Sequence, residues 1–409
     1  MVDEKNIKKL FPFFTNNPNE IYFDSAATTL KPQVVIDGII EYYSKYGTNP
    51  HNTDSDLAYE TYQKFNQVRT KVQKFINAKD SNEIVFTSGT TFALNQIAFG
   101  LEDTIQPGDE ILITYQEHGS NILPWYRLAK NKAATVNFIP LKNHTLDLVA
   151  LSKMISEKTK VISFANISNI LGYEIDVVAV SQKIRALNPN IIIVIDCAQG
   201  ILHTKTDVQK WDVDFICFSA HKMFGPTGVG VLWGKINHLK ALPPLIVGGD
   251  MNARISSDEL SYLLKEVPFC FEGGTQNIAG ILGFAKAIDF INEIGLDDII
   301  AYEQQLKQYA VEQFNLKLKD KIVVYNPDAK TGLLVFNVKD KFAQDVATHL
   351  GTINHITVRS GEHCSKLINQ VIGESNTVRV SFSIYNNKEE IDKLVLALVN
   401  EQDFLGRLV

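Results

Sequence analysis

The stretch "SAHKMFGPTG", residues 219–228, carries the strongest indication of the fold. It follows the apolar run "DFICF" (214–218), which predicts a buried strand. Glycine and proline then predict a sharp turn directly after Lys222. A lysine at the end of a buried strand indicates either chemistry or anion binding. The alternative is a side chain whose amine reaches solvent along an apolar surface.

Similar apolar runs precede and follow this stretch, and helix-like segments separate most of them. Near-continuous apolar strands that alternate with helices predict an α/β fold with a mostly parallel sheet covered on both faces. The last run comes after the tight turn, which allows an antiparallel strand there. The runs are "NEIVFT" (82–87), "DEILIT" (109–114), "KVISFANI" (160–167), "NIIIVIDCA" (190–198), "VDFICFSA" (213–220) and "GVGVLWG" (228–234).

The pattern of predicted helices and strands changes near residue 285. A long helical stretch leads into short strands, including "KIVVYNP", "TGLLVFNV" and "NTVRVSFSIY", and an amphipathic helix follows. This pattern predicts a smaller α+β domain. We therefore expect a large domain over residues 21–285 and a small domain over residues 286–409. An N-terminal segment, residues 1–20, is expected to pack with the small domain.

Composition excludes several classes of protein. The chain has 409 residues, with 45% apolar residues, 21% charged residues and a net charge of -6, which disfavours nucleic acid as a partner. No apolar run is long enough to cross a bilayer, and the start lacks the pattern of a signal peptide. Four cysteines without C-x-x-C spacing predict neither a disulfide framework nor a metal site. We expect a cytoplasmic protein.

Two further strand ends carry polar residues of the kind that bind ligands. In "TSGTT", Thr90 and Thr91 follow a strand and open a helix, where free N–H groups and hydroxyls can bind phosphate. Plain helix capping by threonine is the alternative. In "IIIVIDCAQG", Asp196 ends a strand predicted to be buried, and Gln199 follows it. A buried carboxylate needs a partner, although an aspartate in this place can also cap the next helix.

These strand ends meet at the same edge of a parallel sheet, where ligands of open α/β folds bind. A phosphate-binding turn, a buried aspartate and a buried lysine together match the chemistry of pyridoxal 5'-phosphate. Its protein signature is an aspartate beside the ring nitrogen and a lysine in Schiff-base linkage. The sequence therefore predicts pyridoxal phosphate as the cofactor.

The residues also carry a family resemblance over nearly the whole chain, from about residue 22 to 392. The chain resembles the class V aminotransferase group of fold type I pyridoxal phosphate enzymes. Within that group it is similar to second-group (SUF-type) cysteine desulfurases. The motif from Arg359 to Cys364, R-x-G-x-x-C, narrows the resemblance to the desulfurase and selenocysteine lyase branch. The matching segments are "YFDSAATT", "EIVFTSGTT", "EHGSN", "SNILG", "DCAQ", "SAHKMFGPTGVG", "FEGGTQN", "VRSGEHC" and "VRVSFSIYNNKEEID".

The resemblance implies a fold type I architecture whose large domain contains a mostly parallel seven-stranded sheet, and it implies a role for each matching residue. Lys222 would form the Schiff base, and Cys364 would be the nucleophile that accepts sulfur. Arg379, aided by Arg359 and Asn169, would hold the substrate carboxylate. Thr275 would reach the phosphate of a second subunit, which implies a homodimer. His118 would stack over the ring and also handle protons in catalysis. The other expected cofactor contacts are Asp196 at the ring nitrogen, Gln199 at the ring hydroxyl, Asn169 near the ring, and Thr90, Thr91, Ser219 and His221 at the phosphate.

Local sequence supports a reactive role for Cys364 more than for the other cysteines. It lies in the polar segment "SGEHCSK", beside His363 and five residues after Arg359, and a nearby cation favours the thiolate. Cys217, inside "FICFS", is expected in the core. Cys197 is expected beneath the cofactor. Cys270, which alternates with aromatic residues, is expected in a strand or hairpin.

The resemblance implies an L-cysteine desulfurase that yields alanine and a persulfide on Cys364 for a sulfur-acceptor scaffold protein in iron–sulfur cluster assembly. A selenocysteine lyase or a C–S lyase of the same superfamily is the first alternative. A non-catalytic assembly partner with the same fold is the second. The chain departs from the usual family pattern at several positions: Asn52, Ser55, Gly119, Asn166, Ala220 and Gln276; His51 keeps its family identity.

Overall fold

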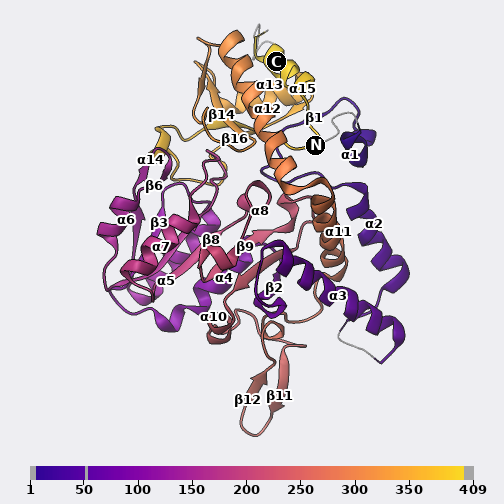
Figure 1. Cartoon of the computed structure of the whole chain (residues 1–409), viewed down its shortest axis with the longest axis vertical. Coiled ribbons are helices and arrows are strands. Elements are labelled where there is room, and N and C mark those ends of the chain that lie inside the picture. Colours follow the sequence, from indigo (N-terminus) through magenta and orange to yellow (C-terminus); the bar gives the residue numbers. More distant parts are fainter. Residues whose placement is uncertain (1–5, 51–53, 400–409) are drawn as a thin grey trace.

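The structure, a computed structural model, describes residues 6–50 and 54–399. His51 and Asn52 lie outside the described residues. Within the described part, seven strands form the central sheet in the order β2-β10-β9-β8-β7-β3-β4 (Figure 1). The strands are β2 (Ile84–Thr87), β3 (Glu110–Thr114), β4 (Thr135–Ile139), β7 (Thr159–Ala165), β8 (Ile192–Asp196), β9 (Phe215–Ser219) and β10 (Gly230–Gly234).

Strand direction in this sheet agrees with the sequence prediction. The pairs formed by β4, β3, β7, β8 and β9 are all parallel. The strand after the tight turn, β10, runs antiparallel to both of its neighbours. Because β2 and β9 are both antiparallel to β10, they run in the same direction as each other and as β8. The carboxyl ends of β2, β8 and β9 therefore lie at one edge of the sheet.

Both faces of the sheet are buried, which explains the continuous apolar runs. In β8, Ile193 and Ile195 pack into one core while Val194 packs into the other. The same alternation holds in β9, where Phe218 and Cys217 face opposite cores. Since successive side chains of a strand point to opposite faces, a sheet with helices on both faces requires apolar residues at every position.

Helices supply both covering layers. The helices before and within the large sheet region are α1 (Pro12–Asn16), α2 (Gln33–Glu41), α3 (Asp56–Phe75), α4 (Thr90–Gly100), α5 (Leu123–Lys132), α6 (Leu148–Met154), α7 (Val177–Leu187), α8 (Gly200–His203), α9 (Val208–Trp211) and α10 (Ile236–Ala241). Those after it are α11 (Ile278–Ile294), α12 (Leu296–Lys317), α13 (Ala343–Asn354), α14 (Asn369–Ile372) and α15 (Lys388–Val399).

A second sheet lies in the C-terminal part of the chain, with the order β13-β14-β17-β16. Its strands are antiparallel: β13 (Ile322–Val324), β14 (Leu333–Val338), β16 (Arg359–Gly361) and β17 (Thr377–Ser381). Helices α12, α13 and α15 lie around it at the top of Figure 1. The predicted boundary at residue 285 falls within the continuous helix α11, and the division into domains stays a prediction.

The beginning of the chain contacts this C-terminal part. Strand β1 (Ile21–Tyr22) pairs in parallel with β15 (Ile356–Thr357). The Phe11 ring packs edge-on against Tyr385 at a centroid distance of 4.8 Å. The Ser25 hydroxyl also lies 2.7 Å from the Tyr385 hydroxyl. These contacts bring residues 22–31 next to the end of β17.

Two hairpins complete the described structure. One joins β5 (Leu141–Lys142) to β6 (Thr145–Leu146). The other joins β11 (Asn252–Ser256) to β12 (Ser261–Leu264) and projects away from the body of the molecule at the bottom of Figure 1. Its exposed apolar side chains include Ile255, Leu260, Tyr262 and Leu263. Among the described residues, no helix combines the length and apolar character that a membrane crossing requires.

Candidate functional site

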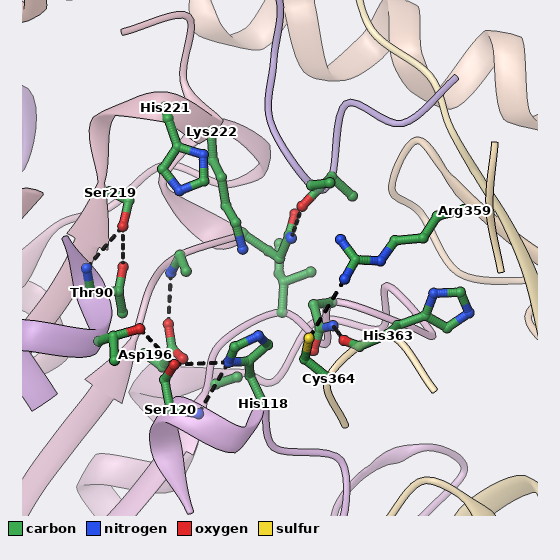
Figure 2. Close-up of a pocket in the computed structure, with 18 of the residues that line it drawn as sticks. Thr90, His118, Ser120, Asp196, Ser219, His221, Lys222, Arg359, His363 and Cys364 are labelled. Carbon is green, nitrogen blue, oxygen red and sulfur yellow. Dashed lines mark hydrogen bonds between the residues drawn. The ribbon is translucent and has the colours of Figure 1, made fainter. Parts of the chain in front are cut away.

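A cavity of about 280 Å³ lies at the carboxyl ends of β2, β8 and β9, where the sequence predicted a ligand. Figure 2 shows side chains from several distant segments converging on it. Thr275 is exposed and does not line this cavity. The predicted site residues that do line it are Thr90, Thr91, His118, Asn169, Asp196, Gln199, Ser219, His221, Lys222, Arg359, Cys364 and Arg379.

One end of the cavity is formed by the start of α4. The N-cap residue is Gly89, which has no side chain to cap the helix, so the alternative of plain capping by threonine is wrong. Instead, the Thr90 N–H donates to the Ser219 hydroxyl over 2.8 Å, and the Thr90 hydroxyl lies 2.7 Å from the same oxygen. These hydroxyls and the helix N-terminus form a polar end suited to a phosphate.

Close packing behind this turn explains its glycines. A Cβ atom on Gly230 of β10 would lie 2.4 Å from the Gly89 Cα atom, which is an impossible contact. Gly89 itself has a φ of 154°, a conformation that side chains disfavour. Glycine at both positions lets β10 pass directly against the turn that begins α4.

Lys222 ends a single 3-10 turn, η6 (Ala220–Lys222), that follows β9 directly. Its side chain extends into the cavity rather than out to solvent (Figure 2). Burial lowers the pKa of Lys222 to about 8, while the charge of Asp196 opposes that shift. A lysine with such a pKa is a better nucleophile at neutral pH than an ordinary surface lysine, because more of it is the free amine.

Asp196 and Gln199 line the same cavity. Asp196 is 4% exposed and accepts the Ala198 N–H over 2.9 Å. Burial raises the pKa of Asp196, although the Ala198 N–H and Lys222 act against the rise. Helix α8 has Gln199 as its N-cap residue, so Asp196 does not cap it. The Gln199 amide donates to the Ala26 carbonyl over 2.8 Å.

His118 faces the cavity as a neutral ring. Its Nδ1 atom accepts the Ser120 N–H over 3.1 Å and lies 3.0 Å from the Ser120 hydroxyl. Burial, then the charges of Lys222, Arg359 and Arg379, lower the pKa of His118 to about 4. Since Nδ1 is an acceptor, the proton of the neutral ring lies on Nε2. Ser120 also contacts Thr91, whose hydroxyl is 2.7 Å away.

Two arginines form a cationic wall. Arg379 of β17 and Arg359 of β16 are direct partners in the antiparallel register. Like charges opposite each other on a sheet are unfavourable unless an anion compensates them. Asp24 compensates in part, because one oxygen of its carboxylate lies 3.0 Å from Arg379. The Arg379 Nε atom is buried without a partner, which leaves capacity for a carboxylate ligand.

Cys364 lies at the mouth of the cavity, exposed to solvent. The Arg359 guanidinium lies 3.5 Å from its sulfur (Figure 2). The Gly119 N–H donates to the Cys364 carbonyl over 2.8 Å. His363 and Cys364 have φ angles of 51° and 61°, so the backbone turns sharply there.

Asn169 holds the segment that carries Cys364. Its amide donates to the His363 carbonyl over 2.9 Å and accepts the Ser365 hydroxyl over 2.9 Å. The Asn169 carbonyl also accepts from Arg379 over 2.7 Å. The sequence predicted Asn169 beside the cofactor ring and the substrate, and the structure adds this anchoring contact.

The residues of the cavity fit pyridoxal phosphate. The Thr90–Ser219 end offers donors for the phosphate, and Asp196 offers a buried carboxylate for a protonated ring nitrogen. The Lys222 amine extends into the same cavity, where it can reach an aldehyde carbon (Figure 2). Within the described chain, no group of three or more His, Cys, Asp or Glu side chains could hold a metal ion.

Sequence reasoning missed several residues that shape this site. Asp24 was quoted in "YFDSAATT" without a role, and Ser120 was quoted in "EHGSN" in the same way. Glu117 is completely buried beside the cavity, where burial raises its pKa to about 8. It accepts from Asn121 over 2.7 Å and from the Ala165 N–H over 2.9 Å. A charged residue within an otherwise buried segment is the signal that could have identified Glu117.

The departures from the family pattern have distinct surroundings. Gly119 lies against the Cys364 segment, where a Cβ atom would be 3.4 Å from the Cys364 carbonyl oxygen. Asn166 is buried against Gly200 and its amide has no partner, for which nothing in the structure gives a reason. The Gln276 amide donates to the Gly273 carbonyl over 2.8 Å. Ser55 caps α3 by accepting the Ala58 N–H.

The remaining cysteines are buried. Cys217 lies in β9 within the core, as predicted. Cys197 follows Asp196 and is fully buried, and burial raises its pKa well above the usual value. The strand predicted around Cys270 is wrong, because this residue lies in the 3-10 turn η7 (Phe269–Phe271). The alternating aromatic pattern there reflects packing of a single turn and not a strand.

Comparison with known proteins agrees with the fold. The family model described as "Aminotransferase class-V" matches residues 21–394. A protein of Ureaplasma parvum serovar 3 named "Probable cysteine desulfurase" is 44% identical over 395 residues, which cover 97% of each chain. One of the same name from Halalkalibacterium halodurans is 40% identical and covers 98% of each chain.

A solved structure supports the same assignment. The apo structure of a cysteine desulfurase from Thermococcus onnurineus NA1 has a TM-score of 0.91 and 34% identity, and the match covers 97% of each chain. Sequence and structure comparisons thus agree over nearly the full length. The chain belongs to the class V aminotransferase family of pyridoxal phosphate enzymes.

Proposed function

We propose that the chain is a pyridoxal phosphate-dependent L-cysteine desulfurase that transfers sulfur to Cys364. One observation supports this most strongly: a single cavity is lined by Lys222, Asp196, Arg379 and the exposed Cys364. The bound cofactor supplies an electron sink that stabilises negative charge at the substrate Cα atom. The relatives and the neighbour named as cysteine desulfurases point to the same substrate.

Each residue then has a defined task. The Lys222 amine would hold the cofactor through its aldehyde, and once released by the substrate amine it would be the base that removes the Cα proton. Asp196 would keep the cofactor's ring nitrogen protonated. Arg379 binds the substrate carboxylate through its free Nε edge, beside Arg359. His118, neutral at physiological pH, would lie over the cofactor ring and can donate from Nε2.

Cys364 performs the sulfur transfer. Its thiolate attacks the substrate sulfur, so that an S–S bond forms as the Cβ–S bond breaks and its electrons go to the substrate carbon. A proton added at Cβ and a proton returned to Cα give alanine, and the sulfur stays on Cys364 as a persulfide. Because Cys364 is exposed, a sulfur-acceptor scaffold protein can reach it, and iron–sulfur cluster assembly in the cytoplasm is the role we assign.

A homodimer completes the proposed site. Thr275 is exposed and outside its own cavity, so it is free to reach the phosphate in a second subunit. The exposed apolar side chains of the β11–β12 hairpin favour burial against another chain. Residues 265–275 connect this hairpin to Thr275, so both features would contribute to one interface.

Substitution of Cys364 by serine tests the proposal. The Cys364→Ser protein should keep bound cofactor and its visible colour change with cysteine, because Cys364 lies at the mouth of the cavity. Alanine release should fall at least about a hundredfold and no persulfide should form, because the nucleophile is absent. Mass spectrometry for the persulfide and chromatography for alanine measure the two products.

Three control measurements separate the alternatives. Alanine formation by Cys364→Ser at the parent rate would show that Cys364 is not the nucleophile, and free sulfide would then identify a C–S lyase. Turnover of selenocysteine but not cysteine by the parent would identify a selenocysteine lyase. If borohydride reduction fixes the cofactor to a peptide without Lys222, the site assignment is wrong.

A further inference from the structure

The peptide carbonyl directly before Lys222 receives an unusual number of hydrogen bonds. Its oxygen, on His221, accepts the Thr29 N–H over 3.0 Å and the Thr29 hydroxyl over 3.1 Å. The Thr28 hydroxyl donates to it over 3.1 Å, and the Lys31 amine over 3.3 Å. All of these donors come from one segment, residues 28–31, which the sequence places far from Lys222.

The same segment also contacts the other side of Lys222. The Thr29 hydroxyl accepts the Phe224 N–H over 2.7 Å, so one side chain bridges the residues before and after Lys222. Thr29 is 2% exposed, which removes competing water. Because the hydroxyl donates to one backbone group and accepts from another, valine in its place would lose both bonds.

Lys31 stabilises the donors themselves. Its amine donates to the Thr28 hydroxyl over 3.0 Å and also to the Thr29 carbonyl. A carbonyl oxygen has two lone pairs and is satisfied by one or two donors. The His221 carbonyl therefore has more donors than the turn requires. These extra donors restrict the orientation of the peptide that joins His221 to Lys222.

This restriction has a chemical use. The Lys222 side chain must repeatedly break and re-form its bond to the cofactor, and its amine is free in between. A reacting group that is held in the correct geometry reacts faster than one that must be reoriented. The η6 turn has no side-chain cap of its own, so the segment 28–31 supplies the missing support.

We propose that Thr29 and Lys31 are positioning residues for Lys222: they hold the His221 peptide so that the Lys222 amine meets the cofactor aldehyde. The inference rests on the proposed function only in assuming that Lys222 bonds pyridoxal phosphate. It gives a role in the reaction to residues 28–31, to which no contact with cofactor or substrate is assigned. It applies whatever amino acid the enzyme uses.

Two cofactor forms separate positioning from general binding. Cofactor-free, full-length protein is mixed with pyridoxal phosphate, and the rate of bond formation is followed by visible absorbance. Calorimetry with pyridoxine phosphate, which carries an alcohol in place of the aldehyde, measures binding without the bond. Thr29→Val should form the bond about tenfold more slowly. Its affinity for pyridoxine phosphate should equal that of the parent.

Matched variants make the result specific. Thr29→Ser keeps the hydroxyl and should react at the parent rate. Lys31→Met should react as slowly as Thr29→Val, and it serves as the test variant if Thr29→Val fails to fold. Thr61→Val removes an equally buried hydroxyl from α3, where it bonds the Thr48 hydroxyl and the Leu57 carbonyl. This control should bond the cofactor at the parent rate.

Several outcomes would overturn the inference. A parent rate for Thr29→Val, an equal loss for both cofactor forms, or a Thr29→Ser protein as slow as Thr29→Val would each exclude a positioning role. A parent protein that never bonds the cofactor through Lys222 would remove the proposed function, and this inference with it. The first three results leave the proposed function intact, so the two failures are distinguishable.

Discussion

At the scale of single residues, Lys222 and Asp196 set each other's protonation. Burial disfavours both charges, which lowers the pKa of Lys222 to about 8 and raises that of Asp196. Their opposite charges act against both shifts. Burial thus keeps part of Lys222 as the free amine for bond formation, while the charge of Lys222 favours the Asp196 carboxylate, which is then available to a protonated ring nitrogen.

Neutralising Asp196 should lower the pKa of Lys222 further. In Asp196→Asn the negative charge that favours the ammonium form is absent, so the free-amine fraction at pH 7 rises. Acetylation of Lys222 in cofactor-free protein, quantified by mass spectrometry, should become a few-fold faster at pH 7. Both proteins should label equally well above pH 10. The exposed substitution Asp297→Asn should change nothing, and slower labelling in Asp196→Asn would contradict the charge coupling.

Some site residues could be predicted from the sequence, and others could not, for a physical reason. Lys222 and Asp196 each follow a buried apolar strand, so local pattern places them at the sheet edge. Asp24 acts through a contact to Arg379, 355 residues away in sequence, and no local pattern encodes it. Thr29 and Ser120 were missed for the same reason, since hydroxyls acquire their role only from neighbours that folding supplies.

At the scale of elements, the segment that carries Cys364 depends on Asn169 for its conformation. The left-handed backbone of His363 and Cys364 is unfavourable for such residues and persists only where surrounding contacts fix it. Asn169 provides two side-chain bonds to this segment, and Gly119 provides a backbone bond. The anchors come from loops after β7 and β3, so the central sheet positions the nucleophile.

Removing the Asn169 amide should loosen this segment. Asn169→Ala should increase hydrogen exchange of residues 362–366 and speed alkylation of Cys364 by about threefold to tenfold, because the loss of two hydrogen bonds permits other conformations. Mass spectrometry measures both quantities. Asn337→Ala, which removes bonds to Tyr325 and Asn376 in the small sheet, is the control. Unchanged exchange in Asn169→Ala would show that the segment keeps its conformation without this anchor.

A buried ion pair joins α3 to the segment before α11. The Arg69 guanidinium meets both Glu272 oxygens at 2.9 and 2.8 Å, and the Phe86 N–H donates to the same carboxylate over 2.7 Å. Both side chains are almost fully buried. Thr275 follows Glu272 by three residues. This buried pair therefore also holds the backbone that positions Thr275 for the proposed dimer contact.

Breaking that pair should cost far more stability than breaking an exposed one. Glu272→Gln leaves a buried guanidinium uncompensated and should lower the free energy of unfolding by about 3–5 kcal/mol. Asp289→Asn, which breaks an exposed pair with Lys71 nearby, should cost under about 1 kcal/mol. Urea unfolding measures both. Adding Arg69→Met to Glu272→Gln should recover part of the loss, and strictly additive losses would exclude coupling between the two charges.

At the scale of the whole molecule, the sequence predicted the layered α/β architecture correctly because both sheet faces are buried. It located neither the β11–β12 hairpin nor the parallel pairing of β1 with β15. Two-residue strands such as β1 leave almost no periodic signal. The exposed apolar hairpin was equally invisible, because exposure depends on how the rest of the chain packs.

Charge on this hairpin should weaken the proposed homodimer. Ile255 and Leu263 are 70% and 63% exposed, and lysine at both positions would place charge in an apolar contact. Sedimentation should show a dimer for the parent and at least about a hundredfold weaker association for the double variant. Lysine at Leu316, which is 75% exposed on α12, should leave association unchanged. A parent monomer at micromolar concentration would exclude the dimer.

The contacts between residues 22–31 and the end of the chain also determine when the enzyme can become active during its synthesis. A ribosome releases the N-terminal segment first, yet β1 has no partner until β15 has emerged, and Asp24 must await Arg379. Lys222 itself emerges well before its cationic neighbours on β16 and β17. The cavity therefore cannot be complete before Arg379 has been synthesised, so we expect the cofactor to bind only after translation has passed β17.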